Sequence, residues 1–135
     1  MSSRSANPWL LTGAVLGALA VACGAFGAHV LKGQFAADGL LSQADEQQLQ
    51  TWETAARYQM YHSLALLTVG LLAARRPATA LHLAGSAMTA GTLIFSGCLY
   101  ALVLTGQRWL GAVVPIGGVL LMVGWICLAV AVAKT

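Results

Sequence analysis

Charged residues are scarce in this sequence, because Asp, Glu, Lys and Arg together make up 8% of its 135 residues. A soluble domain carries about 25% charged residues, so this chain has too few charges to cover a water-soluble globule. The scarcity excludes an ordinary cytosolic enzyme and a disordered tail. The net charge of +3 comes from seven basic residues scattered along the chain, which form no patch for a nucleic acid.

Cysteine is also scarce, and the three cysteines, Cys23, Cys98 and Cys127, all lie within apolar stretches. Their odd number and their positions argue against a disulfide framework. A free cysteine in apolar surroundings usually behaves as a small apolar residue, and we expect the same here.

Hydrophobic residues, by contrast, make up 59% of the chain, and the mean hydropathy is +0.77. The charges leave four long uncharged stretches, at residues 5–30, 58–74, 77–107 and 109–133. A helix needs roughly 20 apolar residues to cross about 30 Å of hydrocarbon. Three stretches reach this length alone, and the second reaches it if its helix begins upstream, near Ser42 or Asp45.

These stretches predict an all-α fold, namely an integral membrane four-helix bundle with up-down-up-down topology. We expect one transmembrane domain over residues 1–135, with an extramembrane segment at 31–55 in which Gly33 and Gly39 break the chain. The second helix should have an amphipathic, interfacial start, with Trp52 at headgroup depth. The expected spans are 8–30, 56–74, 79–104 and 110–133.

The distribution of Lys and Arg predicts the orientation of the bundle. One side carries basic residues and no acid: Arg4, Arg75, Arg76 and Lys134. The other side carries Lys32, Arg57 and Arg108 together with all four acids. We therefore expect both termini to be cytoplasmic.

The N-terminal stretch has a second interpretation, because Arg4 followed by an apolar run is similar to a signal peptide. Residues 20–23 also loosely resemble a lipoprotein cleavage box. The apolar run continues past Cys23 to Val30, which is longer than a signal core, so a retained first helix is favoured. Asn7 is a good N-cap, and Pro8 suits a first helical turn.

Small and polar residues recur at helical spacing and predict which faces pack together. We expect the first helix to lie inside the bundle, away from lipid, on the basis of Gly13, Gly17, Ala20, Gly24 and Gly27. The third helix should point a small and polar face inward and form hydrogen bonds across helices, through Gly85, Thr89, Thr92, Ser96 and Tyr100. Pro115 should lie near the first turn of the last helix, after a less regular entry over 110–114.

The polar residues of the spans should converge on the non-cytoplasmic side, where they form a candidate polar site. Glu53 with Arg57, and Tyr58 with His62, are i,i+4 pairs on one helix. The functional hypothesis is a proton relay or a polar ligand site, and the structural alternative, which we favour, is a hydrogen-bond lattice that fixes the helices. The candidate residues are His29, Glu53, Arg57, Tyr58, Gln59, His62, Ser96 and Tyr100.

His29 and His62 are also a conceivable pair of haem ligands between neighbouring helices. The sequence offers no third ligand set, and His82 lies at the other membrane face, so we expect neither a cofactor nor a metal. Ser96-Gly97 lacks the strand-to-helix context of a hydrolase nucleophile, so we do not expect an enzyme. Convincing internal repeats, which are common in transporters, are not visible either.

Four segments resemble the signatures of the family called domain of unknown function 423, which includes small bacterial inner-membrane proteins and the eukaryotic transmembrane protein 256. These segments are 24–29, 53–62, 95–100 with Thr105-Gly106, and 115–118 with Gly124-Trp125. The resemblance covers about residues 13–130. Cys98 stands where the family pattern has serine and Val114 where it has threonine, so a role for a hydroxyl at either position is in doubt.

The resemblance implies a four-helix inner-membrane protein and supplies no activity. We expect an accessory, assembly or structural membrane protein. The alternative is a small oligomeric transporter or channel for protons or a small polar solute, and a third hypothesis is a membrane enzyme or redox protein. Expected partners are the lipid bilayer and a homo-oligomer or larger membrane complex, with no nucleic acid. Structural roles are expected for Gly24, Gly27, Pro115, Gly117, Gly118, Gly124 and Trp125.

Overall fold

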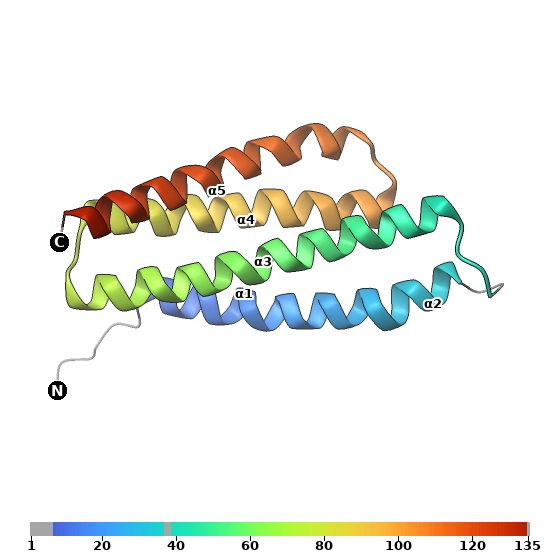
Figure 1. Cartoon of the computed structure of the whole chain (residues 1–135), viewed down its shortest axis with the longest axis horizontal. Coiled ribbons are helices and arrows are strands. Elements are labelled where there is room, and N and C mark those ends of the chain that lie inside the picture. Colours follow the sequence, from blue (N-terminus) through green and yellow to red (C-terminus); the bar gives the residue numbers. More distant parts are fainter. Residues whose placement is uncertain (1–6, 37–38, 135) are drawn as a thin grey trace.

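The computed structural model describes residues 7–36 and 39–134, and these residues form helices and no β-strand (Figure 1). The predicted all-α fold is confirmed. Arg4 and Asp38, two of the charges used to predict the orientation, lie outside the described residues. The elements are α1 (Pro8–Ala25), the π-helix η1 (Phe26–Leu31), α2 (Lys32–Phe35), α3 (Gln43–Arg75), α4 (Thr79–Thr105) and α5 (Trp109–Ala133).

Four long rods lie side by side, because α1, η1 and α2 continue one another as a single rod (Figure 1). Helix α1 packs against α3, α3 against α4, and α4 against α5. The start of α1 and the end of α5 lie at the same end of the bundle (Figure 1). We call this the basic end, since it carries Arg75, Arg76 and Lys134, and we call the opposite end, with η1, α2 and the start of α3, the network end.

Two helices start where the capping residues predict. The Asn7 side chain accepts hydrogen bonds from the backbone N–H groups of Trp9 (3.0 Å) and Leu10 (3.4 Å), with Pro8 in the first turn. The start of α3 is a capping box in which Ser42 and Asp45 each bond to the backbone of the other. Such reciprocal bonds satisfy N–H groups that a helix start otherwise leaves open.

Two predicted helix boundaries are wrong. Gly33 lies inside α2, and the positive φ of +79° occurs at Gly39, after the helix has ended. Pro115 lies inside α5, which begins six residues earlier at Trp109. A proline removes one backbone hydrogen bond, and membrane helices tolerate this loss because neighbouring groups satisfy the freed carbonyl.

Three helices within the described residues are long and apolar enough to cross a membrane: Pro8–Phe35, Thr79–Thr105 and Trp109–Ala133. Helix α3 is not among them. Its first half carries four charges, and its second half begins with polar side chains that include Gln59 and His62. Three of the four expected spans are thus supported. The fourth, at 56–74, stays a prediction.

An apolar core joins the helices in the half of the bundle next to the basic end. Leu66 and Val69 of α3 and Met88 of α4 are fully buried there, with Leu16 of α1 and Leu128 of α5 beside them. The prediction that the first helix avoids lipid is wrong, because only one face of α1 is buried. Its opposite face exposes large apolar side chains: Leu11, Val15, Leu19 and Val21.

Candidate functional site

Gln59 is the centre of a hydrogen-bond network that joins three helices in the network-end half of the bundle. Its side chain is 5% exposed. The Nε2 group donates to the Leu16 carbonyl of α1 at 2.9 Å, and Oε1 accepts from the Tyr100 hydroxyl of α4 at 2.9 Å. One turn away, the Ser96 hydroxyl of α4 donates to the Ala55 carbonyl of α3 at 2.8 Å. The network therefore fixes α1 and α4 against α3.

Trp52 extends this network toward the end of the bundle. Its indole N–H donates to the Cys23 carbonyl at 2.7 Å, just before the π-helix η1. Its ring lies 4.6 Å from the Tyr100 ring and 5.3 Å from the Phe26 ring, between centroids. Trp52 is 5% exposed, so it is an interior residue of the bundle, while its predicted headgroup depth stays a prediction.

Gly27 allows the close approach of η1 to Trp52. A Cβ atom at this position would lie 2.4 Å from Cδ1 of the Trp52 ring, which is closer than nonbonded carbon atoms approach. Small residues have this role in many membrane helix pairs. The predicted structural role of Gly27 therefore has a specific partner.

His62 forms a second, separate link, between α3 and α5. Its Nδ1 lies 2.7 Å from the Tyr58 carbonyl, and its Nε2 lies 3.2 Å from the indole Nε1 of Trp125. An indole N–H only donates and a carbonyl only accepts, so these partners assign the proton to Nδ1 and the neutral form to the imidazole. Both ring nitrogens are engaged. The Tyr58 ring stacks on Phe95 of α4 at 4.8 Å.

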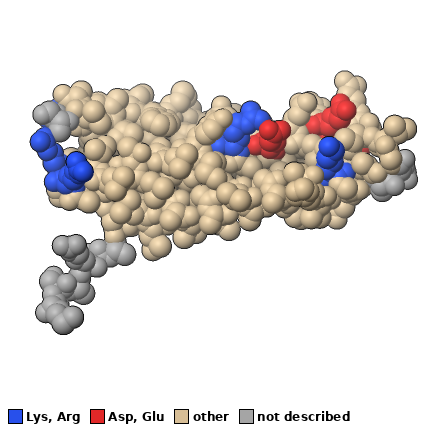
Figure 2. Space-filling view, turned by 60° about the horizontal axis from the view of Figure 1, so that its bottom comes forward, with Lys and Arg blue, Asp and Glu red and all other residues tan. Residues whose placement is uncertain are grey.

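Glu53 and Arg57 form the predicted i,i+4 ion pair, with 2.5 Å between the carboxylate and the guanidinium. Their side chains are 67% and 51% exposed, so the pair lies on the outer surface of α3 and not in the buried network. Exposed pairs of this kind are screened by water and stabilise a helix only weakly. On the face shown in Figure 2, acidic side chains gather in the network-end half of the bundle.

His29 is exposed on η1, and its side chain has no hydrogen bond or ring contact with the described residues. The eight residues of the predicted site therefore separate into a Gln59–Ser96–Tyr100 network, a Tyr58–His62 pair, an outer Glu53–Arg57 pair and an isolated histidine. The reason lies in the face of the helix: η1 turns Gly27 and Leu31 inward, and His29, which lies between them in the sequence, faces outward.

His29 and His62 do not form the pair of haem ligands considered from the sequence. Within residues 7–36 and 39–134, no three His, Cys, Asp or Glu side chains lie together as a ligand set. His62 has no free ring nitrogen for an iron, and His29 faces away from the bundle. The three cysteines are free and lie in three different helices.

The other predicted structural residues have different roles. A Cβ atom at Gly117 would lie 2.5 Å from the Phe95 backbone nitrogen, and one at Gly124 would lie 2.5 Å from Cγ of Met88, so both allow α5 to approach α4 closely. Gly118 lies at ordinary contact distance from the Phe95 ring. Gly24 has no atom within 4 Å of such a Cβ, so it has no packing role.

The hydroxyl face of α4 is buried as predicted, but only part of it bonds across helices. Ser96 and Tyr100 bond to α3, as described above. The Thr89 hydroxyl donates to the Gly85 carbonyl and the Thr92 hydroxyl to the Met88 carbonyl, both at 2.7 Å and both within α4. The prediction of cross-helix bonds is wrong for these two residues, since threonine in a helix readily bonds to the carbonyl four residues earlier.

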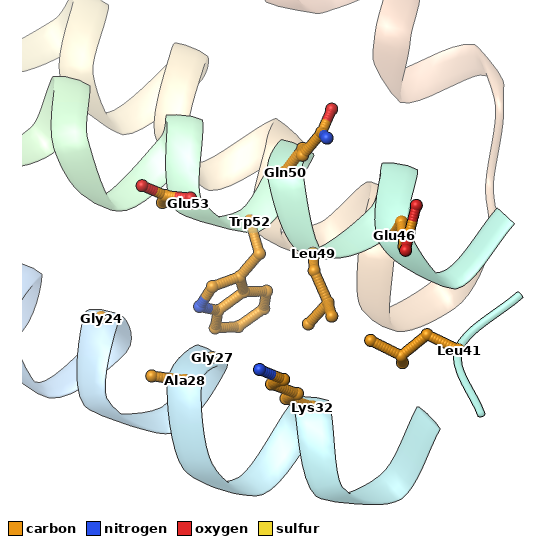
Figure 3. A pocket seen from close by; sticks show the side chains of 10 residues that line it. All are labelled: Gly24, Gly27, Ala28, Lys32, Leu41, Glu46, Leu49, Gln50, Trp52 and Glu53. Atoms are coloured by element: carbon orange, nitrogen blue, oxygen red, sulfur yellow. The ribbon is translucent and has the colours of Figure 1, made fainter. Parts of the chain in front are cut away.

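A cavity of about 550 Å³ lies beside the network, between the α1–η1–α2 rod and the start of α3 (Figure 3). Figure 3 shows Trp52 and Leu49 pointing from α3 toward Gly27 and Lys32 on the facing rod. Gly24 lines the same cavity, and its missing side chain keeps the wall open. The lining combines an ammonium, carboxylates and apolar carbon, which suits a group with both polar and apolar parts.

Sequence reasoning did not include Trp52 in the site, although the spacing contains a signal for it. Trp52, Gln59 and Leu66 are seven residues apart, so they lie on one face of α3. All three are buried. A tryptophan in phase with a buried glutamine and a buried leucine faces the bundle, and this phase is a better guide than the general interfacial preference of tryptophan.

Known proteins share this sequence over almost its full length. A family model described as a protein of unknown function, DUF423, matches residues 23–118. A UPF0382 membrane protein of Staphylococcus aureus (strain bovine RF122) is 42% identical over 126 residues, which cover 93% of this chain and 95% of the relative. The UPF0382 membrane protein YwdK of Bacillus subtilis (strain 168) is 39% identical over 127 residues, which cover 93% and 96%.

No solved structure matches the chain. The relatives are named membrane proteins, which agrees with the three apolar helices and confirms the prediction of a membrane protein. The four signature segments lie on the α1–η1 rod, α3, α4 and α5, and each of these packs against α3 or α4. The family match confirms the resemblance seen in the sequence. The chain belongs to the DUF423 family of membrane proteins.

Proposed function

We propose that this protein is a non-enzymatic component of the inner membrane that acts as an accessory, assembly or structural subunit of a larger membrane complex. One observation carries the proposal. The buried polar side chains in the spans, among them Gln59, His62 and Ser96, each have a partner within the chain. Among the described residues, the Trp9 indole N–H is the one buried side-chain polar atom without a partner. A network satisfied in this way favours a structural role over a site that waits for a substrate.

The outer surface supports the same proposal. Large apolar side chains are exposed on each long helix, for example Leu19 on α1, Leu64 on α3, Leu93 on α4 and Ile126 on α5. Lipid covers such a surface in a monomer, and a partner helix covers part of it in a complex. The small extramembrane part leaves these faces as the main surface through which a partner can be held.

Purification from the native membrane in mild detergent tests this proposal. We expect a tagged copy to recover a second protein in fixed stoichiometry, or a defined oligomer by native mass spectrometry. An unrelated tagged four-helix membrane protein, expressed at the same level, controls for nonspecific capture. Recovery of a monomer without a partner would contradict the proposal.

We also propose that all four rods cross the membrane in up-down-up-down order, with both termini in the cytoplasm. The support is the pair Arg75 and Arg76 at the short loop between α3 and α4, with Lys134 at the same end. The other end carries Lys32, Arg57 and Arg108, which are spread over separate segments. A green fluorescent protein fused to the C-terminus should fluoresce, and alkaline phosphatase inserted near Arg108 should be active. The opposite pair of results would reverse the orientation.

A second candidate function, an oligomeric pathway for protons or a small polar solute, has one observation in its favour. A cavity of about 390 Å³ opens on the side of the bundle, lined by Tyr58, Tyr61, His62 and Trp125, where a second copy would close it. A proton carried by His62 would have to displace the hydrogen bond from Trp125. Flux into proteoliposomes should then fall for His62→Ala and Glu53→Gln, and flux equal to that of empty liposomes would rule this function out.

A further inference from the structure

A hollow of about 370 Å³ lies at the basic end, where the ends of α3 and α5 meet the start of α4. Arg75, Arg76 and Lys134 surround it, and Leu72, Leu81 and Ala131 form its apolar wall. Figure 2 shows basic side chains grouped at this end of the bundle. The hollow therefore combines a basic rim with an apolar interior.

Among the described residues, no Asp or Glu side chain forms an ion pair with the three cations of this hollow. The last acidic residue of the sequence is Glu53, so no Asp or Glu follows anywhere in the second half of α3, in α4 or in α5. The ion pair found within the described residues is Arg57–Glu53, at a different place on α3. The described residues thus supply no acidic side chain to this rim, and its positive charge attracts an anion.

The backbone at the hollow also favours an anion. Helix α4 starts at Thr79 with no side-chain cap. The Leu81 N–H bonds to the Ala78 carbonyl, which leaves the N–H groups of Thr79 and Ala80 without an intrahelical partner, and Ala80 lines the hollow. A helix N-terminus attracts anions through these N–H groups and through the helix dipole. The start of α4 thus adds hydrogen-bond donors next to the guanidinium groups of Arg75 and Arg76, which match the geometry of a phosphate.

The apolar wall decides between a free anion and a lipid. Leu81 is 4% exposed and belongs to the apolar core, and Leu72 and Ala131 pack against the same core. A free phosphate would contact the rim and leave this wall bare. A phospholipid would place its phosphate at the rim and its first acyl carbons along the wall, at the depth where helix ends meet the headgroup layer.

We propose that this hollow, the basic pocket, binds the headgroup of an anionic phospholipid of the phosphatidylglycerol type. Arg75, Arg76 and Lys134 hold the phosphate, and the wall around Leu81 holds the upper part of an acyl chain. The site requires insertion in a membrane and is independent of the proposed partner and of the proposed orientation.

Competition between lipids in native mass spectrometry tests the proposal. The purified full-length protein is mixed with equal amounts of phosphatidylglycerol and phosphatidylcholine, and the ratio of bound lipids is measured. We expect Arg75→Gln with Arg76→Gln to lower the preference for phosphatidylglycerol about tenfold or more. The matched control, Lys32→Gln with Arg108→Gln, removes the same charge elsewhere and should keep the preference. An equal loss in both double variants, or no loss in either, would overturn the proposal.

Two further measurements separate a lipid from a free anion and specific binding from general charge. Ala80→Phe fills the pocket and keeps every charge, so it should also lower the preference for phosphatidylglycerol, while an unchanged preference would contradict the site. Millimolar inorganic phosphate should not displace the bound lipid. Displacement by phosphate would show an anion site at the rim and would overturn the lipid assignment.

Discussion

The two halves of this bundle are held together by different interactions. Near the basic end, Leu66, Val69, Met88 and their neighbours form an apolar core, to which the Asn7 side chain adds a hydrogen bond to the Gly70 carbonyl at 2.9 Å. Near the network end, Gln59, Trp52 and Ser96 donate hydrogen bonds to backbone carbonyls of adjacent helices. The same four rods thus rely mainly on packing at one end and on several directed polar bonds at the other.

This difference matters because the surrounding lipid is as apolar as leucine. Apolar side chains gain little by leaving lipid for the bundle, so the apolar core stabilises through close van der Waals packing. Hydrogen bonds between membrane helices contribute about 0.6–2 kcal/mol each, and they are directional. We infer that the apolar core supplies most of the stability and that the network sets which faces of the helices meet.

Removing a fully buried side chain from the apolar core should have the largest effect. Leu66→Ala leaves a cavity where the side chain is 0% exposed, and we expect it to lower the free energy of unfolding by about 3 kcal/mol. Unfolding in detergent micelles measures the change. The control Leu64→Ala alters a side chain that is 55% exposed on the same helix and should change stability little. Equal losses would show that the apolar core is not the main source of stability.

Adding one carbon at a helix contact near the network should have the next largest effect. Gly117→Ala places a Cβ atom 2.5 Å from the Phe95 backbone nitrogen, and a backbone cannot move without separating α4 from α5. We expect a loss of about 2 kcal/mol in the free energy of unfolding. Gly97→Ala, with nothing within 4 Å, should instead gain up to about 1 kcal/mol from helix propensity. If Gly117→Ala leaves the free energy of unfolding unchanged, the contact between α4 and α5 has room for a Cβ atom and the prediction is wrong.

Removing the centre of the network should lower stability less than the two changes above, but it should loosen the arrangement of the helices more. Gln59→Leu deletes bonds to the Leu16 carbonyl and to the Tyr100 hydroxyl, for an expected loss of about 1–2 kcal/mol. Cysteine cross-links or NMR spectra should also show that α1 shifts against α3. Gln47→Leu, on the exposed part of α3, is the control. A variant that keeps a single well-ordered helix arrangement would break the proposed division of roles.

The link between α3 and α5 should have the smallest effect. Trp125→Phe keeps an aromatic ring and removes the N–H that donates to His62 Nε2, so we expect a loss of about 0.6 kcal/mol, the mean for such bonds in membranes. A double-mutant cycle with His62→Ala isolates this bond from the loss of packing. Trp109→Phe, at an exposed position, serves as the control. A coupling energy of zero would show that the bond between Trp125 and His62 does not contribute to stability.

Local chemistry predicted much of the fold. The Asn7–Pro8 start of α1, the Ser42–Asp45 start of α3 and the inward face of α4 follow from capping and from helical periodicity. The positions that differed depend on neighbours that are distant in sequence. Pro115 lies inside the continuous helix α5, and the close packing on Trp52 depends on Gly27 across the bundle.

The sequence identified the polar residues of the candidate site but not which of them lie together. Gln59, Ser96 and Tyr100 lie together because α3 and α4 bring them to one level of the bundle. The sequence analysis grouped His29 with them only because it is expected at the same depth in the membrane. Depth does not determine which way a side chain points, and a π-helix changes that direction by an amount that composition does not reveal. The face of each residue therefore has to come from the structure.

The π-helix η1 has a consequence for insertions and deletions in this chain. A π-helix takes more residues per turn than an α-helix, so the six residues of η1 act as a phase shift in the first rod. One residue fewer between Phe26 and Leu31 would allow a regular α-helix, and Lys32 would keep nearly the same face because the π turn holds the one additional residue. One residue fewer within α1, where no π turn takes up the change, would instead rotate one part of the rod against the other by about 100°. The contacts of Leu16 with the apolar core and of Leu31 with Trp52 could then not both be kept. The first rod should therefore tolerate a deletion in η1 better than a deletion in α1.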